Sequence, residues 1–450
     1  MSNDTATAAM AAPRRFGTRW VIIGVTALGL TIAYVDRASL SIAIPFIQQE
    51  YGFDQVWKGI ILSAFFWSYA AFQIPSGWLI DKLGVRLVYA VAVIWWSFWT
   101  AMTAVAQGVN SLIGLRLMLG VGEAPVAPSG VKVVSQWFPR HERAFAASIA
   151  DTGQQLGSAL SLPIITLLIA FTGWRMAFVV IGVVGALWVL LWLAVFQTPR
   201  RAKRLPSDEL AYIEAAGARI ETAPGGDAVK WSDLLRYRTV WGMMLGYVCR
   251  AYAVYFFITW YPSYLVEVHH FTLKQLGIYG AIPPFLAIVS TWCGGLFSDT
   301  LVRRGFSLGV ARKIPIIGAL ALASSIILAA YAETTAVALA FLTLAMCSSA
   351  FAAGSVLSLP ADVAPTPDTV GSIAGLQNFG SQIGGILSPI VTGVLLSLDH
   401  GSYRLPLIVA GLVCLTGALI YGLLVKVERL PILATTPRGV PAAASVTRNI

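Results

Sequence analysis

Apolar stretches of roughly 20 residues recur along the whole 450-residue chain and are separated by short polar turns. A helix needs about 20 predominantly apolar residues to cross the hydrocarbon core of a bilayer. Because 57% of the residues are hydrophobic and 12% are charged, the chain lacks the polar residues that cover a soluble fold. We predict an all-α membrane protein with twelve transmembrane helices, near 18–46, 58–80, 88–108, 110–132, 143–171, 174–196, 240–265, 276–298, 313–332, 335–359, 370–397 and 403–425.

The predicted helices fall into two sets of six, separated by a long stretch rich in charged residues. This stretch is predicted to be a cytoplasmic linker that contains some amphipathic helix. The tail after Arg429 lacks helical periodicity and is predicted to be disordered. We therefore divide the chain into a cytoplasmic segment 1–17, a six-helix bundle 18–196, a linker 197–239, a second six-helix bundle 240–425, and a cytoplasmic tail 426–450.

The distribution of basic residues predicts the orientation, because Lys and Arg are retained in cytoplasmic loops. With the amino terminus inside, most basic residues fall in inside loops. The loops assigned outside hold only Lys58, Arg175, Lys274 and Arg404. We predict a multi-pass protein of the cell inner (plasma) membrane with both termini cytoplasmic. The spread of the basic residues over many loops argues against a nucleic-acid partner.

A short motif occurs twice, about half the chain apart: GWLIDKLGVR at 77–86 and GLFSDTLVRRG at 295–305. Each copy has a Gly, an Asp four residues later, and then basic residues. The glycines permit close helix approach, and each Asp can cap a helix or pair with a basic residue such as Arg86 or Arg303. The motif positions are Gly77, Asp81, Gly84, Arg86, Gly295 and Asp299.

The first copy of the motif resembles the conserved loop after the second helix of the major facilitator superfamily. The resemblance covers roughly 18–425. It implies two six-helix bundles, a central cavity, alternating access, and a role for the motif as a cytoplasmic gate. The second copy departs from the pattern because Gly305 is displaced.

Four ionisable residues lie deep in predicted helices: Asp36, Arg37, Arg116 and Glu123. Each charge costs roughly 2.5 to 3.5 kcal/mol near the centre of a membrane helix on insertion scales, so such residues face one another or a water-filled cavity. Arg116 and Glu123 are seven residues apart and therefore lie on one helix face. These residues form either a static buried ion-pair group or a functional site that lines the cavity.

Three strings resemble the anion:cation symporter family within the superfamily: YVDRASLS at 34–41, RLMLGVGEAPVAPS at 116–129 and QWFPRHERA at 136–144. That family includes carriers of galactonate, glucarate, hexuronates, tartrate and phthalate. The resemblance implies that Asp36 and Glu123 couple protons, that Arg37 binds a substrate carboxylate, and that Arg116 is a charge partner.

The resemblance also implies polar substrate contacts. Tyr34, Tyr69 and Gln154 match positions that contact substrate hydroxyls, and Asn378 matches a contact from the carboxy-terminal half. Arg can hold a carboxylate through two hydrogen bonds, while Tyr, Gln and Asn can recognise hydroxyls. Alternatively, the two tyrosines are packing aromatics and the two amides join helices by hydrogen bonds.

Arg250 lies about ten residues, or about 15 Å, into the predicted seventh helix. It either reaches the cytoplasmic boundary and pairs with a loop acid, or faces the cavity opposite Arg37 and binds a second carboxylate. His269 and His270 adjoin in an outside loop with Glu267. This pair is either an ordinary solvated loop or a metal or pH-sensing site.

We predict a secondary active transporter that takes up a small organic anion, most simply a sugar acid, together with protons. The alternatives are uptake of a dicarboxylate such as phthalate or tartrate, and a membrane receptor or sensor without transport. The sequence has no P-loop, zinc-binding HExxH motif, nucleophile elbow or dinucleotide-binding glycine motif, which argues against an enzyme. We expect no cofactor or metal, and a monomer with the organic anion, protons and the lipid bilayer as partners.

Overall fold

The computed structural model describes residues 17–138, 142–202, 205–215, 231–365 and 369–431. All regular elements within these ranges are helices. The first six spanning segments are α1 (Thr18–Tyr51), α2 (Gln55–Leu83), α3 (Val85–Met102) with the short helix η1 (Thr103–Val105), α4 (Val109–Glu123) with α5 (Val126–Trp137), and the two parts of α6 (Arg143–Val195).

The chain reverses inside α6 at Gly173, whose φ of 77° and ψ of 165° are not helical. Only glycine adopts this backbone conformation readily, so α6 supplies two spans. The other six spans are α9 (Arg238–Thr259) with α10 (Tyr261–Glu267), α11 (Leu273–Tyr279) with α12 (Ile282–Arg303), α13 (Leu308–Ala323) with α14 (Ile326–Ala329), α15 (Thr335–Phe351) with α16 (Ala353–Val363), α17 (Val370–Leu398), and α18 (Arg404–Leu423).

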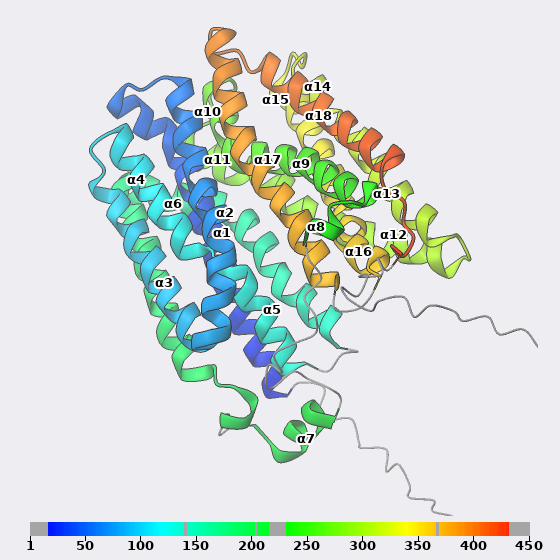
Figure 1. Cartoon of the computed structure of the whole chain (residues 1–450). Helices are drawn as coiled ribbons and strands as arrows, with labels where there is room; N and C mark the ends of the chain where they lie inside the picture. The colour runs from blue at the N-terminus through cyan, green and yellow to red at the C-terminus, as the bar shows by residue number, and fades with distance from the viewer. Residues whose placement is uncertain (1–16, 139–141, 203–204, 216–230, 366–368, 432–450) are drawn as a thin grey trace, which may run out of the picture.

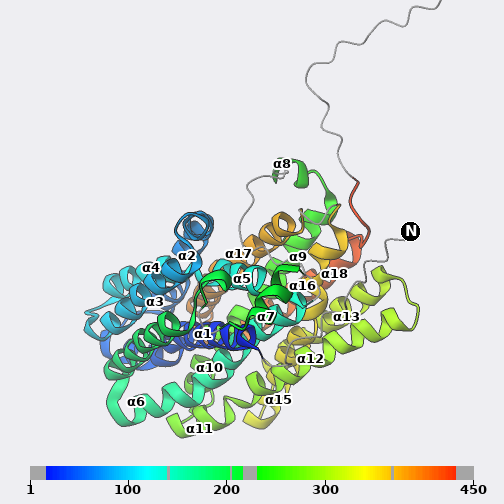
Figure 2. The same cartoon turned by 90° about the horizontal axis from the view of Figure 1, so that it is seen from below.

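These segments confirm the predicted fold of twelve transmembrane helices in two bundles of six (Figures 1 and 2). Among the described residues, nine stretches are long and apolar enough to cross a membrane, and one of these covers both parts of α6. The segments α2 and α4–α5 complete the twelve. Most helix ends lie within a few residues of the prediction. The largest extensions carry polar residues such as Gln48 and Asp299, because helices continue beyond the apolar core into the interface.

The linker between the halves contains η2 (Pro199–Arg201), α7 (Ser207–Ala215) and α8 (Trp231–Leu234). The carboxylate of Glu209 on α7 accepts hydrogen bonds from the Thr18 backbone N–H at 2.9 Å and from the Arg19 guanidinium at 3.0 Å. It therefore caps the amino end of α1, whose first N–H groups lack helical partners. We name this side of the molecule, where α1 begins and α18 ends, the terminal face, and the other side the opposite face.

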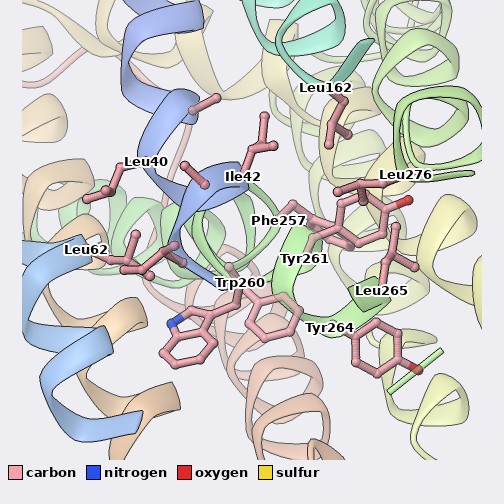
Figure 3. Close-up of a cluster of buried hydrophobic side chains, with 14 of the residues drawn as sticks. Leu40, Ile42, Leu62, Leu162, Phe257, Trp260, Tyr261, Tyr264, Leu265 and Leu276 are labelled. Atoms are coloured by element: carbon pink, nitrogen blue, oxygen red, sulfur yellow. The ribbon is translucent and has the colours of Figure 1, made fainter. Parts of the chain in front are cut away.

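The two halves pack together mainly through α2 with α17, α6 with α11 and α12, and α1 with α9 and α10. Toward the opposite face, α2 and α17 approach very closely. A Cβ on Gly59 would lie 2.5 Å from the Pro389 carbonyl oxygen, and one on Gly393 would lie 2.4 Å from that of Gln55. An apolar cluster joins the halves here and includes Leu40, Leu62 and Leu162 of the first half with Trp260 and Tyr261 of the second (Figure 3).

The predicted disordered tail and the amino-terminal segment lie almost entirely outside the described residues. The same holds for the part of the linker at 216–230. The predicted boundaries of the five segments therefore stay predictions.

Candidate functional site

The site centres on an ion pair between α1 and α4. Nε of Arg37 donates to Oε2 of Glu123 over 2.5 Å. The Arg37 side chain is 7% exposed and that of Glu123 is fully buried. Charge-assisted hydrogen bonds of this kind are stronger than neutral ones, and their strength increases in a dry interior. The two residues that the sequence assigned to substrate binding and to proton coupling thus contact each other directly.

Three aromatic rings surround the Arg37 guanidinium. Its central carbon lies 4.6 Å from the ring centres of Tyr34 and Tyr69, and 4.9 Å from that of Phe65. A guanidinium is attracted to the faces of such rings. The two predicted hydroxyl contacts, Tyr34 and Tyr69, therefore lie beside the predicted carboxylate site.

Asp36 precedes Arg37 on α1, and its Oδ2 accepts a hydrogen bond of 2.6 Å from the Thr100 hydroxyl on α3. Arg116 is buried and lies within electrostatic range of both Asp36 and Glu123. Oδ1 of Asp36 and Oε1 of Glu123 are buried without a hydrogen-bond partner among the described residues. Buried polar atoms are normally satisfied, so both carboxyl groups retain a position at which a proton or a donor can bind.

The structure thus brings the four predicted intramembrane charges together. Sequence reasoning missed Thr100 and Phe65, because neither an ordinary threonine nor a phenylalanine in an apolar helix carries a sequence signal. Tyr255, which lines a cavity beside Arg37, was not predicted either.

Two small cavities border this group. Arg37 and Arg116 line the first together with Tyr255 of α9. Tyr34 lines the second together with Ser158 of α6 and Phe257 of α9. Each cavity has residues from both halves in its wall, so the site lies where the two bundles meet.

The two predicted amide contacts lie near this region but not in the walls of these cavities. Gln154 is half-buried on α6, one turn from Ser158. Asn378 is half-buried on α17. It shares a helix face with Gly385, where a Cβ would lie 2.8 Å from the Phe66 ring of α2.

Arg250 is 9% exposed, and its Nε donates to the Ser349 carbonyl oxygen of α15 over 3.2 Å. No carboxylate pairs with it among the residues that the structure describes. The predicted pairing with a loop acid is therefore not seen in the described part of the chain. Arg250 lies two turns from Phe257 on one face of α9, and Ser349 lies one turn from Met346. Phe257 and Met346 both line the second cavity.

The repeated turns are held differently in the two halves. In the first, Gly84 has a φ of 82°, and Arg86 donates to the Leu193 carbonyl oxygen at 2.7 Å. The side chain of Asp81 lies outside the described residues. Among the described residues nothing lies within 4 Å of a Cβ placed on Gly77, so the close helix approach expected there is not seen, whereas a Cβ on Gly354 of α16 would lie 3.4 Å from the Cα of Gly295.

In the second copy, Asp299 pairs with Arg312 at 3.5 Å rather than with Arg303. Arg312 on α13 also pairs with Asp362 of α16 at 2.9 Å. The expected pairing of Asp299 with a basic residue is seen, but the partner is Arg312 and not the suggested Arg303. Through these two ion pairs Arg312 joins α12, α13 and α16.

The His269 imidazole contacts the Tyr264 hydroxyl at 2.9 Å and the Thr335 hydroxyl at 3.1 Å. Burial lowers the pKa of His269, and the neighbouring His270 lowers it further. Within the described residues, no group of three or more His, Cys, Asp or Glu side chains is placed to hold a metal ion. His269 is therefore anchored to its neighbours rather than fully solvated.

The Major Facilitator Superfamily model matches residues 26–389. The chain is 36% identical to the D-galactonate transporter of Escherichia coli O6:H1, over 90% of this chain and 95% of that protein. It is 34% identical to the "Probable galactarate/D-glucarate transporter GarP" of Escherichia coli, over 90% and 94%. It is 35% identical to the "Probable sulfoacetate transporter SauU" of Cupriavidus necator, over 90% and 94%.

A solved bacterial homologue of the human lysosomal transporter Spinster has a similar fold, with a TM-score of 0.72 and 17% identity. The likeness covers 90% of this chain and 96% of that one. The family match and the relatives agree with the twelve-helix architecture and indicate a transporter rather than an enzyme. The chain belongs to the Major Facilitator Superfamily.

Proposed function

We propose that this transporter takes up a sugar acid together with protons. The observation that carries the proposal is the buried Arg37–Glu123 pair, which lies inside an aromatic enclosure at the junction of the two halves. An arginine in this position can bind a substrate carboxylate, and a carboxyl group in contact with it can control when it does so. The relatives named for galactonate and for galactarate or glucarate support a sugar acid as the substrate class.

Glu123 and the substrate carboxylate compete for Arg37, and this competition couples proton binding to substrate binding. While Glu123 is ionised, it occupies Nε of Arg37. Protonation of Glu123 removes that charge, so Arg37 becomes available to the substrate carboxylate. Burial disfavours the charged form of a carboxyl group and a neighbouring arginine favours it, so access to water can change the protonation state. Asp36 is proposed as a second proton site and Arg116 as the cation that stabilises both carboxylates.

The polyhydroxyl chain of a sugar acid needs polar contacts beyond its carboxylate. Tyr34 and Tyr69 present hydroxyl groups beside Arg37. Gln154 and Asn378 are proposed to bind further hydroxyls from α6 and α17 when the halves close on the substrate.

We place the terminal face in the cytoplasm, because the loops there hold most of the Lys and Arg residues. The two turns that contain Asp81 and Asp299 lie on this face and are proposed to control its opening. The closely packed opposite face would then point outward. We propose that the protein acts as a monomer, since one chain supplies both halves of the site.

The test of this function is uptake of galactonate or galactarate by the purified protein in liposomes. An inward proton gradient of one pH unit is expected to drive about tenfold accumulation for each coupled proton, since one unit corresponds to about 1.4 kcal/mol. A protonophore should abolish accumulation. A sodium gradient that drives uptake in the presence of the protonophore would contradict proton coupling. Binding without any uptake would favour the receptor alternative.

Arg250 favours a substrate with two anionic groups. It is a buried cation on α9, two turns from Phe257 in the wall of the second cavity, and no carboxylate partner balances it among the described residues. An unpaired charge in a membrane interior is costly, so an anionic ligand would stabilise it. Galactarate, which carries a carboxylate at each end, could bind Arg37 with one and Arg250 with the other. The same argument applies to the phthalate or tartrate alternative.

Arg250→Gln is therefore expected to weaken binding of galactarate by about 1.5 to 3 kcal/mol, the usual scale for a charged hydrogen bond. Binding of galactonate, which has one carboxylate, should change little. Isothermal titration of both ligands against wild type and variant measures the difference, and Arg250→Lys is the control that keeps the charge. Equal losses for the two ligands, or none, would leave Arg250 with a structural role only.

A further inference from the structure

A buried polar cluster joins the two halves near the opposite face. Lys58 in the first turn of α2 forms an ion pair and hydrogen bond with Glu267 at the end of α10. The other carboxylate oxygen of Glu267 accepts a hydrogen bond of 2.9 Å from the Tyr403 hydroxyl, just before α18. The Lys58 ammonium also lies 4.9 Å from the ring centre of Trp260.

Lys58 belongs to the first half, whereas Glu267, Tyr403 and Trp260 belong to the second. Of the ion pairs in which both partners are among the described residues, this one alone connects the two halves. The other pairs lie within one half or involve the linker. In the sequence, Lys58 stands out only as one of four basic residues in the loops assigned outside.

The burial of Lys58 is unusual for its position. Its side chain is 0% exposed, although it is only the fourth residue of its helix. Lysine is almost never fully buried unless it is paired, and a buried ammonium without a partner is strongly disfavoured. Lys58 can therefore stay in this position only while Glu267 faces it, which requires the two halves to be together.

The surrounding contacts connect this cluster to α17. Trp260 donates through its indole N–H to the Pro389 carbonyl oxygen of α17 at 3.2 Å. That same oxygen would contact a Cβ on Gly59, the residue after Lys58. The cluster thus lies directly beside the close approach of α2 and α17.

We propose that Lys58, Glu267 and Tyr403 form a latch that keeps the opposite face closed and separates in every transport cycle. When the halves part, Lys58 gains water on the first half. Tyr403 keeps Glu267 oriented on the second half, so the carboxylate is ready to receive Lys58 again. The proposal rests on alternating access but on neither the substrate nor the coupling ion, so it can fail independently of the proposed function.

The test measures the separation of the halves at the opposite face without substrate. Spin labels are attached at Asn110→Cys and Glu333→Cys, which are exposed positions of the first and second half on this face. The four native cysteines are replaced by alanine, and double electron–electron resonance gives the distance distribution in lipid nanodiscs.

Two single variants each remove one partner of the ion pair. Lys58→Met leaves Glu267 without its cation, and Glu267→Gln leaves Lys58 without its carboxylate. Each is expected to raise the ratio of separated to closed molecules at least about tenfold, because removing one partner of a buried pair is strongly destabilising.

The charge-swapped double variant Lys58→Glu with Glu267→Lys should return the ratio to within about threefold of wild type. Tyr403→Phe removes one neutral donor only and should shift the ratio roughly threefold in the same direction as the single charge variants. Tyr403→Phe also tests the latch if a charge variant does not fold. Glu50→Gln is the matched control, since Glu50 pairs with Arg175 on the same face but within one half, and it should leave the ratio unchanged.

Two results would overturn the latch. The first is an unchanged distance distribution in both single charge variants. The second is a shift in the single variants that the swapped pair fails to reverse, which would show that the residues act separately.

Discussion

Arg37→Gln is expected to abolish detectable substrate binding while the protein stays folded. Arg37 supplies the cation within the aromatic enclosure, and glutamine retains hydrogen bonding but carries no charge. Removing one partner of a buried, hydrogen-bonded charge pair costs about 2 to 5 kcal/mol, which corresponds to at least roughly 30-fold weaker binding. Isothermal titration with galactonate and galactarate measures this loss.

Two further variants show whether the loss of affinity comes from the Arg37 guanidinium itself. Arg37→Lys keeps the charge but not the planar guanidinium, so it should recover only part of the affinity. Arg175→Gln breaks an ion pair with Glu50 at the opposite face and should bind substrate like wild type. Wild-type affinity in Arg37→Gln would show that the substrate carboxylate binds elsewhere.

Glu123→Gln is expected to separate binding from accumulation. Glutamine resembles the protonated acid in shape and hydrogen bonding, but it cannot release a proton. Arg37 then loses its anionic competitor, so substrate binding and exchange across the membrane should survive. Accumulation driven by a proton gradient should fall from about tenfold per pH unit for each coupled proton to none, because Arg37 then binds substrate whether or not a proton is bound.

Counterflow and gradient-driven uptake in the same liposomes measure the two properties. Glu50→Gln, which removes an exposed carboxylate of the same half, should retain both. Concentrative uptake by Glu123→Gln at the wild-type level would exclude Glu123 as the essential coupling site. It would leave Asp36 as the remaining candidate.

Much of the fold could be predicted because the bilayer imposes a strong and simple constraint. Each span needs a long apolar stretch, so the twelve segments are visible in the sequence and the structure confirms them. The central charges were also predictable, since a residue such as Glu123 inside an apolar helix is costly unless it has a partner. That these charges face one another was expected, but which carboxylate contacts Arg37 was not predictable, because the sequence does not give the rotation of α1 against α4.

The remaining features depend on contacts between residues far apart in the chain. Lys58 and Glu267 are separated by 209 positions, and each looks like an ordinary loop-end charge in the sequence. Likewise, the partner of Asp299 lies on the next helix rather than in its own turn. Thr100 gave no signal at all, because one hydroxyl in an apolar helix usually bonds to its own backbone. Such partners follow from tertiary packing, which local sequence patterns do not encode.

Substrate and protons are proposed to enter together through this protein, and direct detection of proton entry tests that coupling. Purified protein is reconstituted in sealed liposomes that contain a pH-sensitive dye, and galactonate or galactarate is added outside without an imposed gradient. We expect the interior to acidify only when substrate is present, and Glu123→Gln to abolish that acidification while exchange continues. Substrate entry without internal acidification in the wild-type protein would contradict proton-coupled uptake.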